Sequence, residues 1–254
     1  MRKLALVGVA AGAGAAAFWF GVRPWWRSWG VDPDEADRVL PGDDILPDAR
    51  ITDTRGITID APPSAVWPWL VQMGFGRGGW YSYDVIDMKG SSADHVLPDH
   101  QHLEVGDLVP VSPDAGFVVK ALDPGRSLVL SMDSALMRAQ AEAARARASG
   151  DGAAAEATPA NLRVAGSMLS STSPADFSAT WAFVVEEAPG ARTRLIERLR
   201  VHARQDAEGA AGLGFQFMGF GVFVMVRRQL LGIKERVERA MASPAAAAEP
   251  QTAS

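Results

Sequence analysis

The sequence predicts an α+β domain in which a curved antiparallel sheet is closed by a long C-terminal helix. A strand pattern at residues 55–60 precedes two short helical patterns, strand patterns follow between residues 105 and 202, and a helical pattern covers residues 212–241. Turn-like links between the strands indicate antiparallel meanders. The last helix has to cover the concave side of the sheet, because that arrangement buries the apolar face of both.

Length, composition and charge restrict the class of protein. The 254 residues are enough for one large domain or two small ones, and contents of 48% apolar and 22% charged residues exclude a disordered or collagen-like chain. The absence of cysteine excludes a disulfide scaffold, a thiol nucleophile and cysteine-built metal sites. Residues 1–28 carry four basic groups and no acid, so the remainder is more acidic than the net charge of −5. We therefore expect no nucleic-acid partner.

Residues 4–22 contain no charged or strongly polar side chain. As a helix they would span about 28 Å, close to the roughly 30 Å of a bilayer's hydrocarbon core. Basic residues flank the segment, and two tryptophans follow it, as at a membrane–water interface. We expect residues 1–28 to be a retained single-pass anchor, with the body on the extracytoplasmic side. A cleaved signal peptide with its site near residues 15–17 and a buried helix are the alternatives.

The strand at residues 55–60 leads into a helix that starts at residues 61–64. An apolar stripe at Val66, Leu70 and Met73 faces the core, and Pro68 should bend or restart the helix. A glycine-rich loop then leads to a second short helix over residues 80–88. Four strands are expected at residues 105–111, 116–122, 127–133 and 178–185, and a fifth, the clearest, at 192–202.

Two low-complexity stretches accompany this core. Residues 134–166 are rich in alanine and glycine and are interpreted as a flexible, exposed insertion between two strands, with at most a turn or two of helix at the start. Residues 242–254 are interpreted as a disordered tail. The first half of the helix at 212–241 is apolar, but it is short for a membrane span, so a core helix is expected.

Three sequence runs carry a family resemblance. They are Thr-Arg-Gly-Ile-Thr-Ile-Asp-Ala-Pro-Pro at 54–63, Val-Trp-Pro-Trp-Leu-Val-Gln-Met-Gly at 66–74 and Arg-Gly-Gly-Trp-Tyr-Ser-Tyr-Asp at 77–84. Together they resemble the SRPBCC (START-like) superfamily, in particular a bacterial branch labelled polyketide cyclase/dehydrase. The resemblance covers residues 29–241 apart from the insertion. It implies a helix-grip fold around an apolar cavity, and members that bind lipids, sterols or polyketides or that catalyse cyclisation or hydrolysis.

The ligand-binding residues expected from pattern and resemblance are Gln72, Trp80, Tyr83, Asp84, Trp181, Glu197 and Arg198. The leading hypothesis is a membrane-tethered binding or carrier protein for an apolar small molecule. The alternative is a cyclase/dehydrase-type enzyme in which Tyr83, Asp84 or Glu197 transfers protons. A scaffold that recruits a partner through the insertion is the third hypothesis.

The individual positions leave alternatives open. Glu197 lies two residues from both Leu195 and Leu199 and so shares the inward face of the strand with them. A carboxylate in that position is either a pocket acid or a strand-edge residue that reaches solvent. Trp80, Tyr83 and Asp84 either lie at the cavity mouth or belong to a helix that packs on the sheet with its hydroxyls at the surface. The arginines that alternate with Glu197 are expected on the convex face and mostly solvated: Arg194, Arg198 and Arg200.

No established catalytic motif is present, since the sequence lacks a Gly-x-Ser-x-Gly elbow, a phosphate-binding loop and a His-Glu-x-x-His pair. His95, His100 and His102 alternate with acidic residues and could bind a metal ion, but histidines in a polar loop are usually solvated. We therefore expect neither a metal nor a cofactor.

Overall fold

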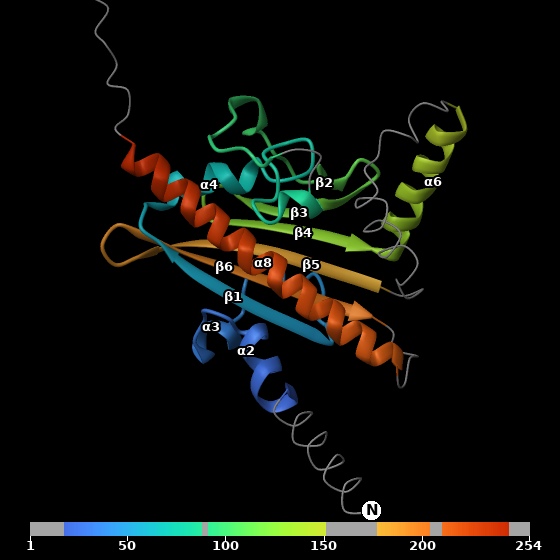
Figure 1. The fold of residues 1–254 in the computed structure, drawn as a ribbon, viewed down its shortest axis with the longest axis horizontal. Coiled ribbons are helices and arrows are strands. Elements are labelled where there is room, and N and C mark those ends of the chain that lie inside the picture. The colour runs from blue at the N-terminus through green and yellow to red at the C-terminus, as the bar shows by residue number, and fades with distance from the viewer. Residues whose placement is uncertain (1–17, 88–90, 151–176, 204–209, 244–254) are drawn as a thin grey trace, which may run out of the picture.

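A six-stranded antiparallel sheet forms the centre of the α+β fold, with the strand order β1-β6-β5-β4-β3-β2 (Figure 1). The computed structural model describes residues 18–87, 91–150, 177–203 and 210–243. The strands are β1 (Ile51–Ile59), β2 (Leu108–Ser112), β3 (Ala115–Asp123), β4 (Ser127–Asp133), β5 (Phe177–Ala188) and β6 (Arg192–Ala203). All six strands expected from the sequence are confirmed; β1, β3, β5 and β6 extend beyond the predicted ranges, and β2 is shifted towards the C-terminus relative to its prediction.

The helix α8 (Ala210–Ala242) crosses one face of this sheet and packs against β1 and the helix α4 (Figure 1). The remaining helices are η1 (Phe18–Val22), α2 (Arg23–Arg27), α3 (Pro33–Asp37), α4 (Pro63–Val71), α5 (Asp84–Asp87), η2 (Pro98–His100) and α6 (Ser134–Gly150). The predicted terminal helix is thus confirmed, as is its position over the sheet.

The main core lies between the sheet, α4 and α8. Leu230, Ile233 and Val237 recur at helical spacing along α8 and are buried against Leu70 and Phe183. Complete burial of one such side chain stabilises the fold by about 1.5–3 kcal/mol. This layer therefore holds the second half of α8 on the sheet.

The opposite face of the sheet is covered by the segment at residues 28–50, so the expectation of solvated arginines there is wrong. Arg198 is 3% exposed and donates to the carbonyl of Ala36 and to the carboxylate of Asp43, both at 2.6 Å. Arg194 pairs with Glu35, and the side chain of Arg200 is also mostly buried. The arginines are covered because their guanidinium groups satisfy the backbone carbonyls of an irregular segment, which would otherwise lack partners.

Local expectations about two helices need correction. Helix α4 does not restart at Pro68 but continues through it, because the proline removes a single hydrogen bond and Ser64, whose carbonyl would accept it, is exposed. The predicted helix at residues 80–88 is limited to Asp84–Asp87. Tyr81 has a φ of 58°, which is in the left-handed region and cannot continue a helix.

The start of the predicted insertion is more ordered than expected. Residues 134–150 form α6, which projects from the end of β4 (Figure 1). The Gln140 side chain accepts from the backbone N–H of Gly116 and donates to its carbonyl, which ties α6 to β3. The rest of the insertion, the tail beyond residue 243 and residues 4–17 of the expected anchor lie outside the described residues. None of the helices in the described part is long and apolar enough to cross a membrane.

Candidate functional site

Glu197 lies in the middle of β6, a strand that has β1 and β5 as its two neighbours, and its side chain is fully buried. The alternative of a strand-edge residue that reaches solvent is therefore wrong. Trp181 on β5 donates its indole N–H to Oε1 of Glu197 at 2.6 Å. Arg55 on β1 donates to Oε2 at 3.2 Å. Each carboxylate oxygen thus has a partner from a neighbouring strand.

These contacts extend into a buried ion cluster, which we define as Arg27, Asp53, Arg55 and Glu197. Arg55 is directly opposite Glu197 in the sheet register and also donates to Asp53 at 2.8 Å. Arg27 reaches in from α2 and donates to the other oxygen of Asp53 at 2.5 Å. A buried charge is tolerated only when it is paired and hydrogen-bonded, and here each charged group has a partner of opposite sign.

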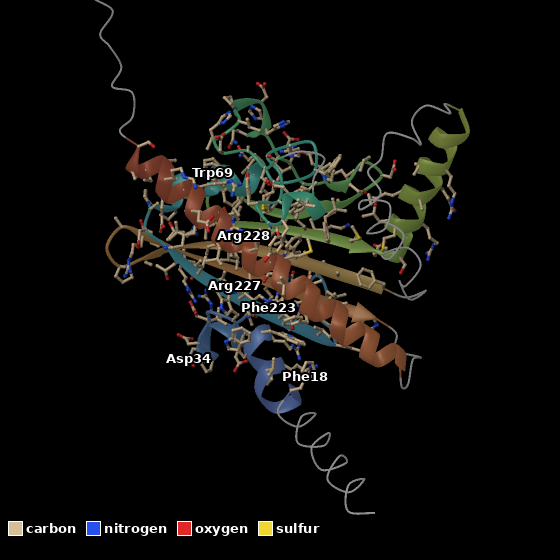
Figure 2. All side chains as sticks on the ribbon, viewed as in Figure 1. Phe18, Asp34, Trp69, Phe223, Arg227 and Arg228 are labelled. Carbon is tan, nitrogen blue, oxygen red and sulfur yellow. The ribbon has the colours of Figure 1, made fainter. Side chains whose placement is uncertain are left out.

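Phe223, which Figure 2 labels on α8, packs against Arg55 of the ion cluster. The guanidinium carbon of Arg55 lies 5.8 Å from the centre of the Phe223 ring, a cation–π distance. The Nε of Arg55 donates to the backbone carbonyl of Trp26 at 3.1 Å. The cluster is consequently enclosed by the sheet, by α2 and by α8, and it contacts three parts of the fold that are far apart in the sequence.

Burial raises the pKa of Glu197 from 4.5 to about 7, against the opposing effects of the Arg55 charge and of the hydrogen bond from Trp181. Protonated and ionised forms of this carboxyl group then coexist near neutral pH. A carboxyl group with such a pKa can accept or donate a proton, although structural ion pairs also shift pKa values.

The raised pKa predicts a pH-dependent stability. The folded protein holds the Glu197 proton more tightly than the unfolded chain, so stability should fall as pH rises from 4.5 to 7. Relative to Glu197→Gln, which has no proton to lose, the wild type should lose about 3 kcal/mol over that range. Urea unfolding of both proteins at several pH values measures this difference. A difference that stays constant with pH would contradict the raised pKa.

Aromatic rings form the layer next to the ion cluster. The ring of Trp181 stacks on Trp80 with a centroid distance of 5.4 Å and an interplanar angle of 14°. Phe117 and Phe183 contact the Trp181 ring at centroid distances of 5.5 and 5.0 Å. The structure thus brings three of the expected site residues together, in the order Trp80, Trp181 and Glu197.

Two buried polar atoms in this region have no partner. Among the described residues, the indole N–H of Trp80 and the Oε1 atom of Gln229 are the buried side-chain atoms that make no hydrogen bond. Both belong to the layer between the sheet and α8, where Trp80 is 6% and Gln229 2% exposed. Native proteins rarely leave buried polar groups unsatisfied, and such groups commonly mark where a water or ligand binds.

The other expected site residues lie elsewhere. Gln72 is fully buried and holds the loop before η2, because its amide bonds the carbonyl of His95 and the N–H of Leu97. Tyr83 is 41% exposed, and Asp84 accepts a hydrogen bond from Ser92. Gln72 and Asp84 are thus engaged with the loops around them, and Arg198 is on the opposite face of the sheet.

The histidine loop has little metal-binding character in the described residues. His95 pairs only with its neighbour Asp94, and both side chains are more than two-thirds exposed. No group of three or more histidine, aspartate or glutamate side chains in the described ranges is arranged to hold a metal ion. A metal site usually needs at least three such ligands.

Sequence reasoning missed Arg27, Asp53 and Arg55. The predicted strand began at residue 55, so Asp53 was not assigned to it. A signal was present in the spacing of the strand. Asp53, Arg55, Ile57 and Ile59 occupy every second position, so the two charged residues share the inward face with apolar residues. Charged residues in such positions require partners, and Glu197 has the same pattern on β6.

Comparisons with known proteins yield remote structural similarities. No family model matches the sequence, and no curated protein does. A protein of Mesorhizobium loti is 16% identical with a TM-score of 0.35, over 74% of this chain and 98% of the other. A conserved protein of Geobacillus kaustophilus is 10% identical with a TM-score of 0.38, over 75% and 97%. CalU16 of Micromonospora echinospora is 14% identical with a TM-score of 0.30, over 75% and 86%.

Proposed function

We propose that the protein is a helix-grip protein of the SRPBCC superfamily that binds an apolar small molecule between the concave face of the sheet and α8. The sequence runs at residues 54–84 support the family assignment. The six-stranded antiparallel sheet, with a long terminal helix across one face, is compatible with the fold of that superfamily. Fold alone does not determine function, so the proposal depends on the chemistry of the residues beneath α8.

The observation that carries the proposal is the unpaired indole N–H of Trp80 on a ring that stacks on Trp181. The stacked rings offer flat apolar surface, which suits a lipid, a sterol or a polyketide-like molecule. The N–H group offers a hydrogen bond to an oxygen of that molecule, and Gln229 offers an acceptor. A ligand hydroxyl can satisfy either group. The preferred ligand is thus apolar with at least one hydroxyl or carbonyl oxygen.

A tether at residues 1–28 completes the proposed function. The length and flanks of the apolar segment at residues 4–22 support membrane attachment, with the body on the extracytoplasmic side. A carrier of poorly soluble molecules gains from this position because its ligands partition into membranes. The tether keeps the binding layer close to their source.

Binding of a fluorescent sterol to the full chain in detergent tests the proposal. Trp80→Phe keeps a stacked ring but removes the N–H, so affinity should fall about three- to tenfold, the effect of one hydrogen bond. The control is Trp25→Phe, the same change on a ring that is 54% exposed. Equal affinity of the wild type and Trp80→Phe would contradict the role of the N–H. No binding, combined with no co-purified lipid in native mass spectrometry, would refute the function.

An enzyme of the cyclase type is the second candidate, and the buried Glu197 with its pKa of about 7 favours it. Such a carboxyl group can act as a general base near neutral pH. The two functions differ in what is recovered after incubation with a bound ligand. A carrier returns the ligand unchanged, whereas an enzyme returns a product, and Glu197→Gln should bind the ligand without converting it.

A further inference from the structure

Exposed apolar side chains gather where α2 packs against α8. Val22, Trp25 and Phe220 are 44%, 54% and 40% exposed, respectively. Val22 has helical backbone angles and lies three residues before Trp25, so these two side chains share one face of the helical segment. We define Val22, Trp25 and Phe220 as the α2–α8 apolar surface.

Buried rings join the two helices beneath this surface. Trp26 of α2 and Phe223 of α8 are each 3% exposed. The Trp26 ring contacts Phe220 at a centroid distance of 5.1 Å. The Phe223 ring contacts both Trp25, at 5.4 Å, and Phe220, at 5.9 Å. Trp25 and Phe220 are therefore the outer members of one aromatic cluster, and the packing of α2 on α8 presents them together.

The space around Phe220 is open. A Cβ atom added at Gly219 or Gly221, the two neighbours of Phe220, would meet no atom within 4 Å outside the backbone of its own helix, and the same holds for Gly21. The exposed area is nevertheless small. Three partly exposed side chains offer far less than the roughly 800 Å² that each partner contributes to a stable protein–protein interface. A second copy of the chain therefore fits this surface less well than a bilayer does.

The charges near this surface suit lipid headgroups. The two segments that form it, residues 18–31 and 209–234, contain arginine and lysine but no aspartate or glutamate. Arg227 is exposed, and it follows Phe220 and Phe223 at helical spacing on the same face of α8. Its guanidinium carbon lies 5.1 Å from the centre of the Trp29 ring. Apolar rings next to basic side chains are typical of the membrane–water interface, where anionic lipids attract the basic groups.

We propose that the α2–α8 apolar surface rests on the lipid bilayer, with Trp25 and Phe220 at the headgroup boundary. The apolar residues 4–17 lead directly into Phe18, whose ring contacts Trp26 at 5.4 Å, so the expected anchor joins the body at this surface. Figure 2 labels Phe18 at the start of the described chain and Phe223 on α8. The inference rests on the proposed membrane attachment and adds a second point of lipid contact, on α8.

Site-specific fluorescence tests this contact, because a chain without cysteine can carry one label at a chosen position. Phe220→Cys and Val105→Cys, each labelled with an NBD fluorophore, are compared in the full chain in vesicles of phosphatidylcholine and phosphatidylglycerol. Val105 is the control, because it is 63% exposed and precedes β2, at the edge of the sheet opposite to β1 and α2. Lipids that carry a spin label near the headgroup should quench the label at position 220 at least about twice as strongly as the label at position 105.

Equal quenching at the two positions would overturn the inference. A blue-shifted label at position 220 that the spin-labelled lipids do not quench would also overturn it, since a second copy would then cover the surface. Should Phe220→Cys fail to fold, Gly221→Cys places the label beside the same surface without a steric conflict. Failure of the proposed attachment gives a different result, because the full chain would not float with the vesicles. A chain that floats with them but shows equal quenching refutes the α8 contact alone.

Discussion

Arg55→Met is expected to lower the free energy of unfolding by about 3–5 kcal/mol. The side chain of Arg55 is fully buried and pairs with both Asp53 and Glu197. Its removal leaves the two buried carboxyl groups of the cluster with one cation of the cluster, Arg27, which pairs with Asp53 and not with Glu197. Urea denaturation of the two proteins, followed by circular dichroism, measures the loss.

Arg38→Met provides the matched control for that change. Arg38 pairs with Glu186, but both side chains are 38% exposed, and such surface pairs contribute at most about 1 kcal/mol. Adding Glu197→Gln to Arg55→Met should restore part of the stability, because the neutral amide needs no counter-charge. If Arg55→Met is no less stable than Arg38→Met, the buried ion cluster does not form in solution.

Gly232→Ala is expected to lower stability by about 3 kcal/mol, although alanine is the better helix former. A Cβ atom at this position of α8 would collide with the backbone carbonyl oxygen of Tyr81. That carbonyl cannot easily move, because Tyr81 has a positive φ and its hydroxyl donates to the carbonyl of Trp69 at 3.1 Å. Thermal unfolding of the variant measures the effect of this close approach.

Gly221→Ala is the control in the same helix. A Cβ atom there meets nothing within 4 Å, so the higher helix propensity of alanine should raise stability by up to about 1 kcal/mol. The two substitutions are chemically identical and should have effects of opposite sign. A stabilising effect of Gly232→Ala would mean that α8 does not pack against the Tyr81 loop.

Local sequence patterns predicted the order of the elements well. Strand alternation and turn residues found β3, β4, β5 and β6 within a few residues, and the inward position of Glu197 followed from period-2 counting on β6. Strand alternation, turns and the face on which a strand residue lies are set by residues close together in the sequence, so a local pattern can reveal them. The need to bury the apolar faces of the sheet and of the last helix likewise predicted that α8 covers the sheet.

The partners of Glu197 could not be predicted in the same way. Arg55 is 142 residues away and meets Glu197 only through the register of β1 and β6. The burial of Arg198 could not be predicted either. Three of the acceptors of its guanidinium group are backbone carbonyls in residues 35–38. Backbone acceptors are the same for every residue type, so no side-chain pattern in the sequence reveals them.

The pairing of the first strand with the last also determines when the sheet can be completed during synthesis. Strand β1 leaves the ribosome well before β6, its partner in the described sheet, and closing so long a loop slows folding. Before it pairs with β6, a first strand of purely apolar residues would tend to pair with other chains. In the unpaired strand Asp53 and Arg55 are expected to be solvated, and charged side chains in an exposed strand disfavour pairing with other chains. The two charges that require compensation in the finished sheet should therefore lower aggregation of the nascent chain until β6 is free to pair.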